Sequence, residues 1–162
     1  MENLKPMFTS TQQSKIIAID IETSSNGTLL DIGYYRQFVD GCEYYTSFNN
    51  WKTFFECLLQ ISGNIRVIAH NGFGFDYIGF AQWFLKNRKH YNIPDEDVTF
   101  LSSESLMIGM IINTEISNIV FLDTMRFFPA TSLQKLAESF LGEGKDEVPN
   151  DYISRMEDYK SE

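Results

Sequence analysis

Residues 15–23 read KIIAIDIET, an apolar run that ends in two acidic residues. A short run of this kind predicts a buried strand over Lys15–Ile21. Asp20 and Glu22 are two positions apart, so in a strand their side chains project from the same face. Two carboxylates this close repel each other, and a divalent cation between them relieves the repulsion. The segment therefore predicts a strand that carries an acidic pair at its end.

Turn signals and apolar periodicity divide the rest of the chain into short strands and three helices. We expect the first three strands to pair antiparallel, after which a helical crossover adds a strand parallel to the first. Strands first, then strand and helix alternating, predict an α/β domain with a mixed β-sheet flanked by α-helices. The further predicted strands are Leu29–Phe38, Cys42–Phe48, Ile65–Ala69, Val98–Leu101, Leu106–Ile112 and Ile116–Leu122, and the predicted helices are Trp51–Ile61, Tyr77–Asn87 and Ser132–Leu141.

The composition is that of a folded domain with an acidic surface. Of the 162 residues, 43% are hydrophobic and 15% aromatic, enough for a core of its own. The net charge of −9 and the pI of about 4.7 argue against a protein that holds nucleic acid through a broad basic face. They leave open an enzyme whose acidic centre meets nucleic acid through Mg²⁺. We expect a flexible lead at 1–14, one domain at 15–149 and a charged tail at 150–162.

The sequence also predicts where the protein resides. Residues 1–14 are polar and lack the apolar centre of a secretion signal. Cys42 and Cys57 follow no zinc-binding spacing and are expected to be two reduced thiols. No apolar run approaches the length of a membrane span. We therefore expect a soluble, intracellular protein that is not secreted and has no membrane partner.

A third carboxylate follows the next buried strand. The stretch AHNGFGFDY, residues 69–77, places Asp76 at the expected start of a helix. Taken alone, an acid at the start of a helix often serves only to stabilise the helix through its dipole. An acidic pair at the end of a strand is often simply exposed to solvent. Together the three carboxylates favour a metal site, and Gly72 and Gly74 would let the backbone approach a ligand closely.

These motifs together resemble a known family. DIET at 20–23 and HNGFGFD at 70–76 resemble, in order and spacing, the first two exonuclease motifs of the DEDD proofreading nucleases, specifically those of family B DNA polymerases. The stretch FLDTMRFFPATSLQKLAESFLGEGKDEVP at 121–149 is similar to the segment that follows in protein-primed members from phages and linear plasmids. The resemblance covers Lys15 to Pro149 and implies a ribonuclease H-like fold.

The resemblance also implies a reaction and its residues. Asp20, Glu22 and Asp76 match the acidic residues that hold two Mg²⁺ or Mn²⁺ ions for 3′→5′ hydrolysis of the terminal phosphodiester of single-stranded DNA. The implied partners are a single-stranded DNA 3′ end, the DNA polymerase portion that follows, and a terminal protein primer. The residues that match single-strand contacts are Thr23, His70, Asn71, Phe75, Thr124, Met125 and Lys145.

The third motif of the family, Y-x-x-x-D, has no match. Tyr152 is followed four residues later by Met156, and Tyr159 would need a residue beyond Glu162. We therefore expect the chain to end before this motif, with its second metal site incomplete and with weak or absent activity on its own. Two alternatives stay open: a catalytically inactive nucleic-acid-binding or protein-interaction module with the same fold, and another ribonuclease H-like exonuclease.

Overall fold

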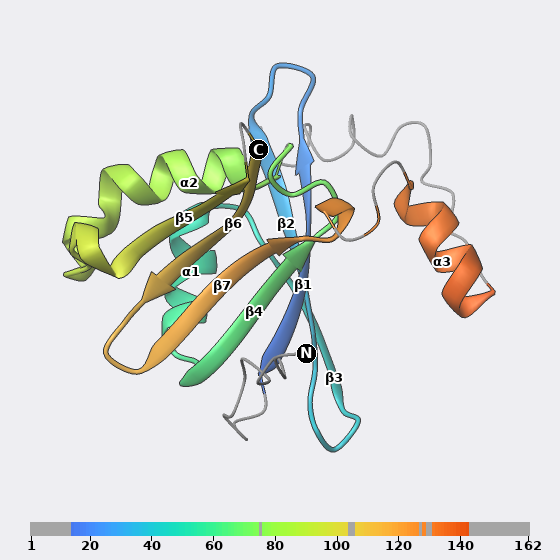
Figure 1. The fold of residues 1–162 in the computed structure, drawn as a ribbon, viewed down its shortest axis with the longest axis horizontal. Coiled ribbons are helices and arrows are strands. Elements are labelled where there is room, and N and C mark those ends of the chain that lie inside the picture. Colours follow the sequence, from blue (N-terminus) through green and yellow to red (C-terminus); the bar gives the residue numbers. More distant parts are fainter. Residues whose placement is uncertain (1–13, 75, 104–105, 127, 129–130, 143–162) are drawn as a thin grey trace, which may run out of the picture.

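A seven-stranded mixed sheet runs through the protein in the order β3-β2-β1-β4-β7-β6-β5 (Figure 1). The computed structural model describes residues 14–74, 76–103, 106–126, 128 and 131–142. The strands are β1 (Lys15–Thr23), β2 (Leu29–Gln37), β3 (Glu43–Phe48), β4 (Gly63–Ala69), β5 (Val98–Ser103), β6 (Leu106–Asn113) and β7 (Ser117–Asp123). The helices are α1 (Trp51–Leu59), α2 (Asp76–Asn87) and α3 (Leu133–Leu141), with short 3₁₀ segments η1 (Arg88–Tyr91), η2 (Asp95–Asp97) and η3 (Thr124–Arg126).

The pairing of the strands explains how distant segments meet. The predicted antiparallel meander of β1, β2 and β3 is confirmed, and α1 crosses over to β4, which pairs parallel to β1 as predicted. Strand β7 pairs parallel to β4, and β6 and β5 extend the sheet in antiparallel fashion beyond it. Strands β1, β4 and β7 therefore run in one direction and end at the same edge of the sheet (Figure 1). The predicted α/β class with a mixed sheet is confirmed.

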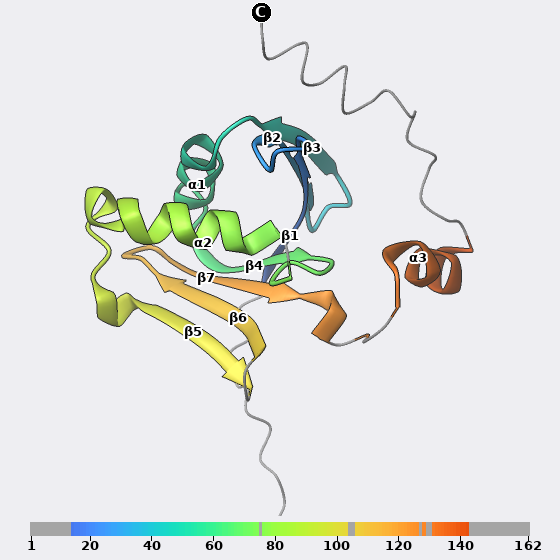
Figure 2. The ribbon, with the colours of Figure 1, turned by 90° about the horizontal axis from the view of Figure 1, so that it is seen from above.

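Helices α1 and α2 cover one face of the curved sheet (Figure 2). The β1 residues on this face, Ile17, Ile19 and Ile21, are buried. The alternate residues of β1 face the other way, and Ile16 among them is 56% exposed. The prediction of a buried strand was therefore right for one face and wrong for the other, because α1 and α2 pack against one face only. We call the second face, which carries Asp20, the open face.

Aromatic rings fill the space between the sheet and the two helices. Phe55 of α1 and Phe80 and Phe84 of α2 are completely buried. The rings of Phe55 and Phe84 meet edge to face with centroids 5.2 Å apart, and Phe80 lies 4.8 Å from the ring of Phe121 on β7. Such contacts add to the large apolar area that each ring removes from water. This packing fixes α2, whose first turn lies beside the strand ends.

The helix ends follow the capping residues in the sequence. The side chain of Asn50 accepts a hydrogen bond from a first-turn amide of α1 at 2.9 Å, and Ser132 does the same for α3 at 3.3 Å. Gly142 ends α3 with a φ of 76°, the left-handed conformation that glycine adopts without strain. The remaining differences are small: α1 ends at Leu59, and α2 begins one residue earlier than predicted, at Asp76.

The predicted lead and charged tail fall almost wholly on residues 1–13 and 143–162, which lie outside the described part of the chain. Among the helices that are described, none is both long enough and apolar enough to span a membrane. Cys42 is an exposed free thiol and Cys57 a partly buried one.

Tyr77, in the first turn of α2, joins this helix to two parallel strands. Its ring is completely buried, and its hydroxyl donates toward the carbonyl of Val67 on β4 at 3.0 Å and that of Leu122 on β7 at 3.1 Å. Burial raises the pKa of Tyr77 well above its usual value, so the hydroxyl keeps its proton. Gly72 leaves room for the ring, because a Cβ there would collide with it. The start of α2 is thereby held against β4 and β7.

Replacing Tyr77 by Phe should lower the free energy of unfolding by about 1–3 kcal/mol, because a buried carbonyl and a partly buried one lose the donor they share. Urea unfolding followed by circular dichroism measures this loss. Tyr44→Phe is the matched control: Tyr44 is 49% exposed, so removal of its hydroxyl should change stability by less than about 0.5 kcal/mol. Equal effects of the two substitutions would contradict the bridging role of Tyr77.

Candidate active site

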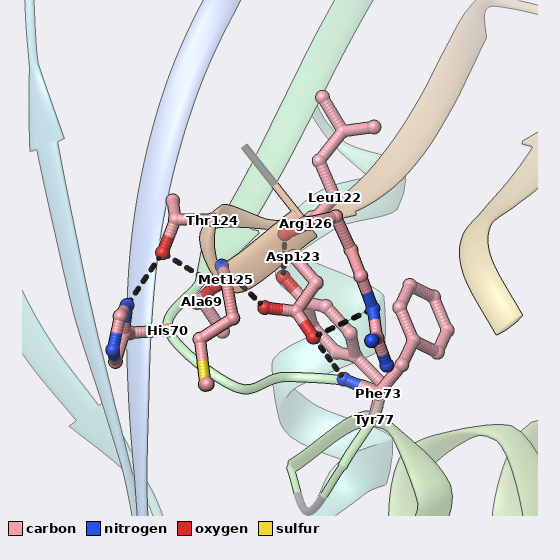
Figure 3. A network of polar contacts seen from close by, with 9 residues as sticks. All are labelled: Ala69, His70, Phe73, Tyr77, Leu122, Asp123, Thr124, Met125 and Arg126. Carbon is pink, nitrogen blue, oxygen red and sulfur yellow. Dashed lines mark hydrogen bonds and ion pairs between the residues drawn. The ribbon is translucent and has the colours of Figure 1, made fainter. Parts of the chain in front are cut away.

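Polar residues lie at the ends of the three parallel strands or directly after them. Ligand sites in α/β proteins commonly lie outside the carboxyl ends of parallel strands. The register pairs Ala69 at the end of β4 with Asp123 at the end of β7, and Figure 3 shows the residues that follow these two strands side by side. The polar residues near the strand ends are Asp20, Glu22 and Thr23 of β1, His70 and Asn71 after β4, Asp123 at the end of β7, and Thr124 directly after it.

Asp20 lies in a cleft of about 530 Å³ on the open face, together with His70 and Thr124. Nδ1 of His70 lies 2.9 Å from Oγ1 of Thr124, and this hydroxyl also donates to the carbonyl of Ala69 at 3.3 Å (Figure 3). Because His70 follows β4 and Thr124 follows β7, the parallel pairing of these strands is what brings the two side chains together. Three of the predicted site residues therefore share one cleft.

Asp76 lies on the helix side of the sheet. It is 8% exposed and lines a second hollow, of about 580 Å³, together with Thr23 and Gly74. Trp51 and Trp83 from the two covering helices line the same hollow. Five of the predicted site residues are thus divided between two hollows: Asp20, His70 and Thr124 line the one on the open face, and Thr23 and Asp76 line the one beside α2.

The carboxylates nevertheless share one electrostatic environment. The pKa of Asp76 is raised from 3.8 to about 7, first by burial and then by the charges of Asp20, Asp123 and Glu22. Because like charges act in this way only at short range, both carboxylates of β1 and that of Asp123 lie near Asp76. A bound cation would remove this repulsion.

The donor set suits Mg²⁺ or Mn²⁺, since hard divalent cations prefer carboxylate oxygens. Asp20, Glu22 and Asp76 supply such oxygens, and their mutual repulsion is the condition that a cation offsets. Within the described ranges, no three His, Cys, Asp or Glu side chains are grouped as ligands of a single ion. The two-ion site therefore stays a prediction, one that these residues fit by their chemistry.

Asp123 is not among the predicted site residues, yet it is completely buried beside them. Its carboxylate accepts hydrogen bonds from the backbone amides of Phe73 at 3.1 Å and Met125 at 2.9 Å, and Nε of Arg126 lies 3.8 Å away (Figure 3). Asp123 thus ties the loop after β4 to the loop after β7. The sequence could have pointed to Asp123, because it is an acid that ends an apolar strand and precedes a threonine. Glu22 shows the same pattern.

A further acid, Asp31, faces Glu22 across the β1–β2 ladder. Directly opposed residues of an antiparallel pair project from one face, and like charges in this arrangement are destabilising. The ladder is irregular at this point, because its register shifts between Glu22 and Thr23. No signal in the sequence could have identified Asp31, since its proximity to Glu22 depends on the register of the two strands.

Two further predicted residues, Asn71 and Met125, follow the ends of β4 and β7. Asn71 is exposed and has a φ of 61°, a left-handed conformation that asparagine tolerates better than most residues. Gly74 leaves room for the Asn71 amide, because a Cβ there would collide with it. Met125 is partly buried in η3. The residues of the sequence prediction that lie outside the described part of the chain are Phe75 and Lys145, together with Tyr152 and Met156.

The raised pKa of Asp76 predicts how stability depends on pH in a metal-free buffer. Between the unfolded pKa of 3.8 and the folded pKa of about 7, the folded protein binds more protons than the unfolded chain. The free energy of unfolding should therefore fall as the pH rises through this range. Asp76→Asn removes the titration and should make the protein more stable than the wild type by about 4 kcal/mol at pH 8, with a smaller difference near pH 4.

Urea unfolding at a series of pH values, with EDTA present, measures this difference. Glu96→Gln is the control, because Glu96 is an exposed acid in η2. This substitution should leave the pH profile of stability unchanged. If the Asp76→Asn profile ran parallel to that of the wild type, Asp76 would not hold its proton near neutral pH in the folded protein.

Comparison with known proteins adds no family to this description. No protein-family model matches the chain, and no curated protein matches it significantly. The likeness to family B exonuclease motifs is therefore a resemblance of residues and spacing.

Proposed function

We propose that the chain is the 3′→5′ proofreading exonuclease domain of a family B DNA polymerase, which hydrolyses the terminal phosphodiester of single-stranded DNA with Mg²⁺ or Mn²⁺. One observation carries the proposal. Strands β1, β4 and β7 end at one edge of the sheet, where Asp20, His70 and Thr124 line one cleft. These residues lie far apart in the sequence. Asp20 and His70 match positions of the two exonuclease motifs, and Thr124 matches a single-strand contact in the segment that follows them.

The finer fold assignment belongs to the same proposal. The resemblance implies a ribonuclease H-like domain, with a mixed sheet flanked by helices. The antiparallel meander β3-β2-β1, followed by β4 and β7 parallel to β1, supports this assignment. Strands β5 and β6, which come between α2 and β7 in the chain, extend the sheet beyond β7 without disturbing the edge where the parallel strands end.

In this proposal Asp20, Glu22 and Asp76 hold the divalent ions. Such ions supply activation of a water molecule and stabilisation of the leaving oxygen in phosphodiester hydrolysis. A carboxyl group must be deprotonated to serve as a ligand, and the pKa of Asp76 is about 7. Cation binding at Asp76 is therefore coupled to the release of a proton near neutral pH.

The other residues of the cleft bind and orient the strand end. His70 and Thr124 form a hydrogen-bonded pair that presents an imidazole and a hydroxyl to sugar and phosphate oxygens. Asp123 acts indirectly, because its bonds to the amides of Phe73 and Met125 hold the two loops on which these residues lie. Asp123 is thus a positioning residue.

A second candidate function is a catalytically inactive nucleic-acid-binding module with the same fold. The observation that favours it is the division of Asp20 and Asp76 between two hollows, with no ligands grouped for one ion within the described ranges. The absence of an acid four residues after Tyr152 agrees with it. The two functions differ in whether DNA cleavage depends on a divalent cation and on Asp20.

The test uses the 162-residue chain and a 5′-labelled single-stranded oligonucleotide in Mn²⁺, Mg²⁺, Ca²⁺ or EDTA. We expect binding that depends on the divalent cation and slow removal of nucleotides from the 3′ end in Mn²⁺ or Mg²⁺. Asp20→Asn should abolish removal, because loss of a ligand at such a site costs orders of magnitude in rate. A blunt duplex should bind more weakly, since its end must first unpair.

Glu96→Gln is again the control, and it should behave as the wild type does. Binding without any cleavage, unchanged in Asp20→Asn, would favour the inactive module. Absence of single-strand binding under every divalent condition would contradict both functions.

A further inference from the structure

Two tyrosines lie opposite each other on the open face of the sheet. Tyr35 of β2 and Tyr45 of β3 are direct partners in the antiparallel ladder, so their side chains project from the same face. They are 37% and 71% exposed, whereas Tyr34, which faces the helices, is 2% exposed. The two exposed rings therefore contribute little to the core.

Both tyrosines line the cleft that contains Asp20. The β1–β2 register places Ala18 opposite Tyr35 and Asp20 opposite Gly33. A Cβ at Gly33 would lie 3.6 Å from the hydroxyl of Tyr45 and 3.5 Å from the backbone oxygen of Asp20. The Tyr45 hydroxyl thus reaches over Gly33 toward β1, and both tyrosines and Asp20 line the same cleft.

The chemistry of this end of the cleft favours a flat, uncharged ligand. Among the described residues that line the cleft there is no Lys or Arg, and His70 is its one basic side chain. Glu43 adds a negative charge nearby, and its hydrogen bond to Tyr35 raises the pKa of that phenol. A phosphate would be repelled here, whereas a nucleobase offers an uncharged π face to the tyrosine rings.

We propose that Tyr35 and Tyr45 form a stacking site for an unpaired base of the strand whose 3′ end lies at Asp20. The site rests on the proposed function and extends it to the nucleotides behind the terminal one. Neighbouring strands are about 4.8 Å apart, so the backbone of Tyr45 on β3 lies about 10 Å across the sheet from β1. Its side chain spans part of this distance, because the hydroxyl lies next to Gly33 of β2. The two rings therefore lie beside Asp20 and farther from β1, where a base behind the terminal nucleotide can stack while the terminal phosphate lies at Asp20.

Fluorescence anisotropy of a labelled oligothymidine in Ca²⁺ tests the site with the complete chain. Tyr45→Leu and Tyr35→Leu should each weaken binding about tenfold, the effect of losing one base–aromatic stack. Tyr45→Phe keeps the ring and should bind as the wild type does. Tyr44→Leu is the matched control, because Tyr44 is the adjacent residue of β3, faces the other way and is 49% exposed. Its affinity should stay within about twofold of the wild type.

A second substrate separates stacking from a structural effect. Oligothymidine with abasic sites directly behind the 3′-terminal nucleotide should bind the wild type about tenfold more weakly. Tyr45→Leu should show no further loss with this substrate, because the substitution and the abasic site remove the same contact. Circular dichroism checks that each variant retains its fold.

Two outcomes would overturn the stacking site in different ways. The stacking site alone would be contradicted if Tyr35→Leu and Tyr45→Leu left the affinity unchanged. It would also be contradicted if Tyr45→Leu and the abasic sites weakened binding independently of each other. The proposed function would survive that result if wild-type binding still depended on the cation and on Asp20. If the wild-type chain bound no single strand in any divalent cation, the proposed function would fail and the stacking site with it.

Discussion

The parallel pairing of β4 with both β1 and β7 is the constraint on which the candidate site depends. The Tyr77 hydroxyl reinforces this pairing from the helix side, since it donates toward carbonyls of β4 and β7. Asp123 reinforces it at the edge, where its carboxylate holds the loops that follow both strands. With the strands held in this way, His70 and Thr124 lie beside each other and next to Asp20.

The acidic residues at this edge oppose folding unless a partner offsets their charge. Asp76 is buried near three other carboxylates, and Glu22 faces Asp31 across the first ladder. Placing several carboxylates close together does not stabilise a fold. Such an arrangement is typical of sites that bind a cation or perform acid–base chemistry. The aromatic packing of α1 and α2 against the sheet compensates, because it buries large apolar rings beside the charged edge.

Periodicity and turn chemistry predicted the strands and helices to within a few residues, since both are local properties. The same reasoning overestimated the burial of β1, because the identity of a residue does not show whether a second layer covers it. Asp123 lies at the end of an apolar strand in the sequence, as the predicted acids of β1 do. Its burial and its hydrogen bonds to two backbone amides, however, depend on the pairing of β4 with β7. The sequence could not show that Tyr35 and Tyr45 lie opposite each other, because cross-strand partners depend on the register of the two strands.

By itself, then, the sequence determined the α/β class, the order of the elements and the positions of the acids at strand ends and at the start of a helix. These properties depend on hydrophobic period, capping and turn residues, all of which lie within short windows. Only the tertiary structure decided that β7 joins β4, that Asp20 and Asp76 line different hollows, and that two tyrosines share the Asp20 cleft. Those properties depend on strand register and on which face the helices cover, and contacts between distant segments determine both.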